Sequence, residues 1–445
     1  MKKTVSFLLS LIILLGIVFY IFVYPKFEIV SGFNAKVLCS CTFLSGIDQE
    51  RAEKEELGFS LLWLASNTID EMDKTVTSSV FGMHQKTAVY REGFGCALVN
   101  DLDVDEIKEQ QRGLTDQNYT ADIWPDREVV GTEAIQNALR KAFDKEGEEK
   151  LITRAVVVLK DGQLIGEAYA DGVGRKTPLL GWSMAKTITG FMAGILVGDG
   201  HWELDSSLPI EEWANDERSD ITLKNAMQMS TGLAWEEDYG KVSFATKMLY
   251  GSDDMGAYAQ SLSLAYHPGE HWEYSSGTSN ILARTMENFF ADESDYHSFP
   301  FRRLFEPIGA ESFVLETDAS GHFVGSSYGY GSARDWAKLG LLALNKGNWQ
   351  GTQIIDSTWV TFMTEVPAKD SDGQYGGQTW LNRNGKFSNY SEQAYWMGGF
   401  QGQQVSVHPD KNMVIVRLGV TNTRGDFDFD AFAKEVFEAV EPPVN

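Results

Sequence analysis

The first feature of the chain is an almost unbroken apolar stretch from Val5 to Tyr24, which follows Lys2 and Lys3. About 20 apolar residues are needed for a helix to cross a bilayer, and no small-residue cleavage site follows this stretch. We therefore expect an uncleaved transmembrane anchor over residues 1–25. The lysines would lie on the cytoplasmic side and the remainder would be exported, to the periplasm or the cell exterior. A cleaved signal peptide is the alternative and gives the same exported location.

Beyond the anchor, apolar periodicity predicts strands near both ends of one domain and helices between them. Residues 154–172 form two apolar runs around Asp161-Gly162, a strong hairpin signal. Helical spacing predicts helices at several places, with Gly232 and Gly347 as stops. The ranges with helical spacing are 132–146, 183–197, 332–347 and 426–440, and further strands are expected within 376–382, 394–409 and 412–420.

These elements predict an α/β domain over residues 126–445. Its α/β part would comprise 126–185 and 346–445, and an inserted helical part would comprise 186–345. Residues 26–125 form an N-terminal extension without a catalytic motif. A cleft between the sheet part and the helical part would be the natural place for an active site.

Composition narrows the function classes. The chain has 445 residues, 43% of them hydrophobic, and a formal net charge of -25. Such an acidic surface repels phosphate backbones, so we expect no nucleic-acid partner. We also expect no cofactor or metal, because the histidines, including His267 and His271 beside a Pro-Gly turn, fit no ligand spacing. The sequence leaves the oligomeric state open.

The three cysteines are consistent with an oxidising compartment. Cys39 and Cys41 are too close together to pair with each other easily, so we expect one of them to bridge to Cys96, and we take Cys41 as the partner. Lipidation of Cys39 is a weaker alternative.

The candidate chemistry begins at "GWSMAKTITG", where Ser183 precedes Lys186 by three residues. Residues three apart share one face of a helix, and a helix N-terminus offers free amide groups. The apolar residues that follow would shield the lysine from water, and such an amine can take the proton of a serine hydroxyl. The pattern alone is weak, since a helix-capping serine followed by a lysine looks the same.

Two later stretches supply the support. "HPGEHWEYSSGTSNIL" carries Tyr274 and Ser276 between a Pro-Gly turn and a helix, and "WMGGFQGQQVSVHP" is a glycine-rich strand. With "SMAK", these stretches resemble the serine β-lactamase and penicillin-binding-protein superfamily, specifically its class C-like branch. That branch includes esterases, D-amino-acid peptidases and 6-aminohexanoate-dimer hydrolases. The resemblance covers about residues 130–440 and implies a β-lactamase-like fold, in which helices flank an antiparallel sheet.

The resemblance also implies roles for individual residues. Ser183 would be the nucleophile that accepts the acyl group, Lys186 would help to deprotonate it, and Tyr274 would pass the proton to the leaving group. The amides of Ser183 and Gln403 would form the oxyanion hole, because Gln403 follows Gly402, the glycine of the third motif.

Two departures from the family pattern bear on the substrate. Ser276 replaces the usual Asn of the second motif and can still donate a hydrogen bond to an acyl side chain. The third motif reads Phe400-Gln401-Gly402 and lacks the Lys or His that meets a β-lactam carboxylate. This absence disfavours efficient penicillin hydrolysis.

Three cations near the third motif are interpreted as ordinary surface charge. Four aromatic residues near the motifs are candidates for an apolar acyl pocket or for core packing. The cations are Arg383, Lys386 and Arg417, and the aromatic residues are Trp182, Trp272, Trp396 and Phe400.

The sequence thus predicts an exported, membrane-anchored serine hydrolase that cleaves a small ester or amide through an acyl-enzyme on Ser183. One alternative is a non-catalytic receptor of the same fold that recognises peptidoglycan or a partner protein. Others are a D,D-peptidase and a weak β-lactamase. A different nucleophile, Ser327 in "GSSYG", would require a strand before it and a helix directly after it.

Overall fold

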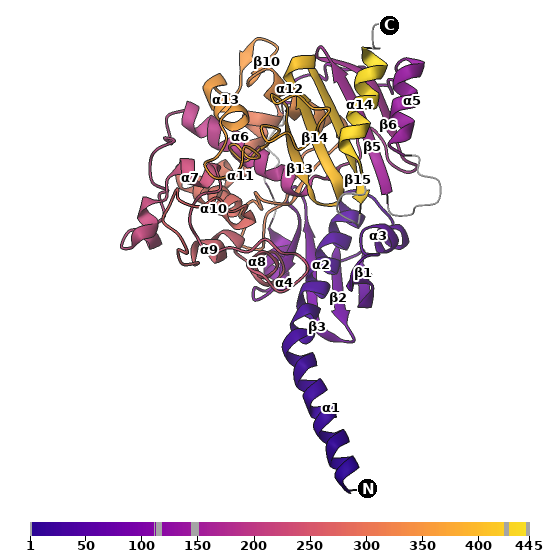
Figure 1. The fold of residues 1–445 in the computed structure, drawn as a ribbon, viewed down its shortest axis with the longest axis vertical. Coiled ribbons are helices and arrows are strands. Elements are labelled where there is room, and N and C mark those ends of the chain that lie inside the picture. The colour runs from indigo at the N-terminus through magenta and orange to yellow at the C-terminus, as the bar shows by residue number, and fades with distance from the viewer. Residues whose placement is uncertain (1, 111, 113–117, 144–150, 422–426, 442–445) are drawn as a thin grey trace. The chain divides into compact units, whose positions relative to one another are not determined.

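The computed structural model describes residues 2–110, 112, 118–143, 151–421 and 427–441, which form two compact units (Figure 1). The first unit comprises Met1–Arg91, Cys96–Gln110 and Glu236–Asp253, and the second comprises Glu92–Gly95, Gln111–Trp235 and Asp254–Asn445. The predicted extension therefore matches the first unit only in part. Glu236–Asp253, which we placed in the helical part, packs with the N-terminal residues instead.

In the first unit, a long helix lies against a four-stranded sheet of order β1-β2-β3-β4. Helix α2 continues from α1 almost without a break and packs on β2 and β3. The exposed side chains of α1 give way to buried ones from Phe27 onward. The elements are α1 (Lys2–Phe22), α2 (Tyr24–Phe43), α3 (Gln49–Glu55), β1 (Ala65–Asp70), β2 (Thr75–Val80), β3 (Met83–Arg91), β4 (Gly95–Val99), α4 (Val104–Glu109) and α8 (Phe244–Gly251).

The apolar helix is the one candidate for a membrane span among the described residues. It runs over Thr4–Phe43, its most apolar window has a mean hydropathy of 2.8, and none of that window is buried. A signal sequence would pass the same test, so the helix by itself does not distinguish an anchor from a signal sequence.

The disulfide joins Cys39 to Cys96, with 6.1 Å between the Cα atoms. Our choice of Cys41 as the partner is therefore wrong, and lipidation of Cys39 is excluded by the same bond. Both candidates lie on α2, where residues two apart point in directions about 200° apart. Only one of them can face β4, and that one is Cys39.

The core of the second unit is a six-stranded antiparallel sheet of order β12-β13-β14-β15-β5-β6. The expected hairpin is present, since Asp161 and Gly162 have φ angles of 51° and 75° and join β5 to β6. The strands are β5 (Leu151–Lys160), β6 (Gln163–Tyr169), β12 (Trp380–Leu381), β13 (Tyr395–Gly399), β14 (Gln403–His408) and β15 (Met413–Thr421).

Helices cover both faces of this sheet. Val156, Val158 and Ile415 pack with α5 (Glu133–Lys141) and α14 (Phe429–Val440) in one apolar cluster. On the other face lies α12 (Ala333–Leu344), where a side chain at Gly340 would meet Val414 at 2.6 Å. Adjacent positions of one strand thus face different helices, and for this reason the central strands are buried without an alternating pattern.

Between β6 and β12, the unit contains the inserted helical part and two small sheets. Its helices are α6 (Ala185–Gly198), α7 (Leu223–Met227), α9 (Met255–Gln260), α10 (Ser276–Met286) and α11 (Glu293–Pro300), and α13 (Ser357–Glu365) follows α12. One small sheet has the order β7-β9-β8, formed by Leu179–Leu180, Gly329–Gly331 and Val314–Leu315, and the other pairs β10 (Asn348–Trp349) with β11 (Thr352–Gln353).

Candidate active site

Ser183 lies at the start of the apolar helix α6, within the 3₁₀ turn Trp182–Met184. Trp182 has a φ of 47°, a left-handed conformation that is uncommon for a bulky residue and concentrates at functional sites. Its indole donates a hydrogen bond to Gln401 Oε1 at 3.0 Å and contacts the Phe400 ring edge-on at 5.6 Å between centroids. Two residues of the third motif, Phe400 and Gln401, therefore contact Trp182, whose backbone conformation is unusual and which precedes the nucleophile.

Lys186 is the second residue of α6 and is 1% exposed. Its amine donates to Ser183 Oγ at 3.2 Å, to Ser276 Oγ at 2.9 Å and to the Ser326 carbonyl at 3.0 Å. It also lies over the Tyr274 ring, 4.8 Å from the centroid. The structure thus brings together the serine, the lysine and the tyrosine that the sequence motifs predicted.

Ser276 makes a contact with Lys186 that the sequence did not predict. It is the first residue of α10, whose N-terminus is capped by the Ser275 hydroxyl, which accepts from Thr278 N at 3.0 Å. Its side chain is fully buried and receives the hydrogen bond from Lys186. Ser276 therefore belongs to the hydrogen-bond network of the lysine, and its expected hydrogen bond to an acyl side chain of the substrate stays a prediction.

The end of β13 lies directly against the segment that leads to Ser183. A Cβ atom built on Gly399 would stand only 2.1 Å from the Gly181 carbonyl oxygen. Gln403 starts β14, pairs with Gly399 across the turn, and ties its side-chain amide to Gly419. Glycine is required at position 399 by this close approach of two backbones.

Arg417, on β15, forms hydrogen bonds with the turn between β13 and β14. It is 1% exposed and donates to the carbonyls of Gln401 and Gly402 at 3.2 and 2.8 Å. Burial, with a smaller effect from the charge of Arg154, lowers the pKa of Arg417 to about 9. Our interpretation of Arg417 as surface charge is wrong. Its apolar neighbours in β15 gave no sign that the guanidinium would be turned towards a loop.

Aromatic side chains continue from Tyr274 along the sheet edge. Its ring stacks on Trp380 at 5.1 Å, and Trp380 stacks on Trp396 at 6.4 Å between centroids. The amine of Lys386 lies 5.7 and 5.4 Å from those two indole rings, so it packs on aromatic faces. Phe400 is 38% exposed, which leaves part of its ring open to a ligand. Of the other expected pocket residues, Trp182 contacts Phe400 and Trp272 contacts Tyr375.

The stretch around Ser327 borders this site but lacks the geometry of an α/β-hydrolase nucleophile. Ser327 is 2% exposed, its hydroxyl bonds to that of Ser326, and turns surround it where a strand and a helix would be required. The Ser326 carbonyl is the group that reaches Lys186.

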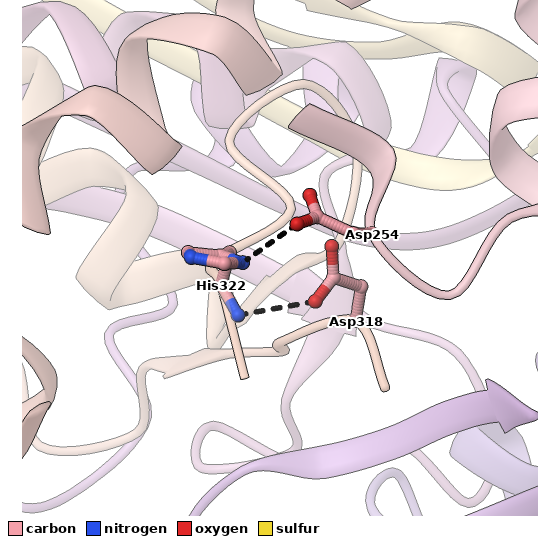
Figure 2. Close-up of side chains that lie close together, drawn as sticks. All are labelled: Asp254, Asp318 and His322. Carbon is pink, nitrogen blue, oxygen red and sulfur yellow. Dashed lines mark hydrogen bonds and ion pairs between the residues drawn. The ribbon is translucent and has the colours of Figure 1, made fainter. Parts of the chain in front are cut away.

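A second polar cluster, missed in the sequence, consists of Asp254, Asp318 and His322 (Figure 2). The oxygens of Asp318 accept from Met255 N, from Ser320 and from His322 N, and His322 Nε2 lies 2.9 Å from Glu287. Burial raises the pKa of Asp318 to about 6. Because protein donors already engage these carboxylates, we interpret the cluster as a structural ion-pair network. Asp254 and Glu287 lie far in sequence from each other and from the pair Asp318 and His322, which is why no single motif indicated the cluster.

Comparison with known proteins identifies the family of the chain. The Beta-lactamase family model matches residues 139–439. The chain belongs to the beta-lactamase family. The 6-aminohexanoate-dimer hydrolase of Paenarthrobacter ureafaciens is 20% identical over 307 residues, which cover 61% of this chain and 73% of that protein. This family of hydrolases has both esterase and amidase members.

Solved structures share the fold at low identity. A candidate 6-aminohexanoate-dimer hydrolase from Bacillus anthracis has a TM-score of 0.57 at 19% identity, with 73% of this chain and 87% of that chain covered. A family VIII carboxylesterase has a TM-score of 0.54 at 14% identity, with coverage of 70% and 98%. These likenesses establish the predicted β-lactamase-like fold.

Proposed function

We propose that the protein is a membrane-anchored, exported serine hydrolase that cleaves a small ester or amide bond through an acyl-enzyme on Ser183. The observation that carries the proposal is the position of Lys186, which is buried and donates to both Ser183 Oγ and Ser276 Oγ. A hydroxyl next to a shielded amine is an activated nucleophile. A serine that merely caps a helix would not need this arrangement.

In the proposed reaction, Lys186 acts as the neutral amine: it keeps its hydrogen bonds to Ser276 Oγ and the Ser326 carbonyl, and its lone pair accepts the proton of the Ser183 hydroxyl, with Tyr274 as the neighbouring proton carrier. The Ser183 oxygen attacks the substrate carbonyl, and the tetrahedral oxyanion accepts hydrogen bonds from main-chain amides. The same proton then passes to the leaving alcohol or amine as the acyl-enzyme forms. A water molecule then gives a proton to Lys186 and attacks the acyl-enzyme. That proton returns to the Ser183 oxygen as the acid is released.

One oxyanion donor would be the amide of Ser183, and the second would come from the turn between β13 and β14. The sequence motif pointed to Gln403. The contact of Gly399 with Gly181 and of Phe400 with Trp182 favours the amide of Phe400 as a further candidate for this role.

The residues of the turn between β13 and β14 indicate the class of substrate. Gln401 and Gly402 contribute no cation, and Phe400 presents a partly open ring beside Trp182. An apolar or neutral acyl group suits this surface better than a β-lactam carboxylate. The hydrolase of 6-aminohexanoate dimers among the relatives makes a linear amide a reasonable second substrate.

The test uses the full chain in detergent with a fluorophosphonate probe, aryl esters of graded acyl length, a chromogenic cephalosporin and a 6-aminohexanoate dimer. We expect labelling of Ser183, turnover of short esters or the dimer, and loss of both in Ser183→Ala. Ser327→Ala is the matched control and should retain labelling. Labelling without turnover of any substrate would favour the receptor, and cephalosporin turnover above ester turnover would favour a β-lactamase.

A further inference from the structure

The turn between β2 and β3 has an unusual residue at its tip. Phe81 and Gly82 join Val80 to Met83 with φ angles of 53° and 74°. Two central residues with positive φ define a type I′ turn, for which Asn-Gly and Asp-Gly are strongly preferred. Asp161-Gly162 follows that preference in the second unit. A phenylalanine is costly in this backbone conformation, so local folding does not account for Phe81.

The Phe81 side chain is also 69% exposed, so burial in the protein does not account for it either. Its ring contacts Phe27 at 6.0 Å, and nearby Tyr24 contacts His84 of β3 at 4.4 Å between ring centroids. Figure 1 shows the connected ends of β2 and β3 beside the region where α1 meets α2. The turn therefore lies at the junction of α1 and α2.

This junction coincides with the expected membrane surface. A helix rises about 1.5 Å per residue and needs about 20 residues to cross a hydrocarbon core of about 30 Å. Counted from Thr4, the span ends at about Val23. Tyr24 then falls at the headgroup level, where tyrosine and tryptophan are enriched. Glu28, the first acidic residue beyond this level, is paired with Lys86 at 2.7 Å.

We propose that the β2–β3 turn is a second membrane contact, in which Phe81 enters the boundary between headgroups and acyl chains of the bilayer that α1 crosses. This inference rests on the proposed membrane anchoring and adds a defined protein–lipid surface to it. The lipid offers an exposed aromatic ring the apolar surroundings that the protein does not. The contact would also restrict the tilt of the first unit on the membrane.

Trp63 provides a matched control, because it is also 69% exposed in the same unit. The carbonyl of the preceding Leu62 accepts a hydrogen bond from Asn34 on α2. Asn34 lies about 15 Å further along the helix axis than Tyr24 at 1.5 Å per residue. Trp63 is thus an exposed aromatic residue at a level that the lipid does not reach.

The experiment places a nitroxide label on the full chain in phosphatidylcholine–phosphatidylglycerol vesicles, in a Cys41→Ala background. The labelled variants are Phe81→Cys, Trp63→Cys and Ile13→Cys. We expect labels at 81 and 13 to collide several-fold more with oxygen than with a water-soluble nickel chelate, and the label at 63 to show the reverse. A water-exposed label at 81 with a lipid-exposed label at 13 would overturn the proposal and leave the anchor intact. A water-exposed label at 13 would refute the anchor itself. Spin–spin broadening at 81 would indicate a second copy of the chain and also overturn the lipid contact.

Phe81→Asn gives a second readout that does not depend on labels. Because Asn-Gly suits a type I′ turn, this variant should fold with an unchanged or higher melting temperature. In vesicles, the amides of residues 80–84 should exchange hydrogen several-fold faster in Phe81→Asn than in the parent protein. Trp63→Asn should leave exchange in this peptide unchanged. Equal exchange in Phe81→Asn and the parent would contradict the proposal.

Discussion

The contact between Gly399 and Gly181 predicts that one added methyl group at the end of β13 strongly lowers the proposed hydrolase activity. A Cβ at position 399 would lie 2.1 Å from the Gly181 oxygen, about 1 Å closer than real contacts of this kind allow. Gly399 itself has a φ of -132°, which any residue can adopt, so Gly399→Ala adds a clash without backbone strain. The turn and the Ser183 segment must then move apart by about 1 Å. A misplacement of that size can lower a rate by about 100-fold, which corresponds to about 2.7 kcal/mol in the barrier.

The assay is kcat/KM for an aryl ester, together with the rate of fluorophosphonate labelling and the melting temperature. The control is Gly198→Ala at the end of α6, where an added Cβ meets no atom within 4 Å. The control should retain full activity, with a stability gain of up to about 1 kcal/mol. If Gly399→Ala folded and kept its kcat/KM within about two-fold of the parent, the proposed fit between β13 and the nucleophile segment would be refuted.

Two further predictions concern stability. Burial lowers the pKa of His408 from 6.5 to about 3, so its contribution to stability is complete above pH 6.5 and declines as pH falls towards 3, by about 2 kcal/mol at pH 5. His408→Phe should remove this part of the acid sensitivity in urea titrations between those two pH values, and an unchanged pH slope would contradict the assignment. The bridge of Cys39 to Cys96 closes a loop with a sequence separation of 57, so Cys39→Ala should lower the free energy of unfolding by about 4 kcal/mol. Cys41→Ala should cost much less, and equal losses in these two cysteine variants would contradict the assigned pairing.

The sequence predicted the parts of the fold that local patterns determine. Asp161-Gly162 marked its hairpin because the turn chemistry is local, and the Thr132 cap marked α5 in the same way. The border of the first unit could not be predicted. The segment that contains α8 joins the first unit through tertiary packing, on which hydrophobic periodicity carries no information.

In the candidate site, too, the sequence predicted the contacts that depend on local spacing and missed those that depend on tertiary packing. The spacing of Ser183 and Lys186 predicted their contact, since residues three apart share a face along the turn that leads into α6. The interpretation of Arg417 as surface charge was wrong and the contact of Ser276 with Lys186 was missed, because both depend on how α10 and β15 pack against other segments. A single guanidinium in an apolar strand gives no sign of which backbone it will reach.

The central claim is that Ser183 carries the acyl group during turnover. Mass spectrometry of the protein, quenched during turnover, tests this claim most directly. The full chain is mixed with an aryl ester, quenched with acid within the first turnovers, digested and mapped by mass spectrometry. The account predicts a peptide that contains Ser183 and carries the mass of the acyl group, and its absence in Ser183→Ala. Ester turnover with the acyl group on another residue, or equal turnover by Ser183→Ala, would contradict the account.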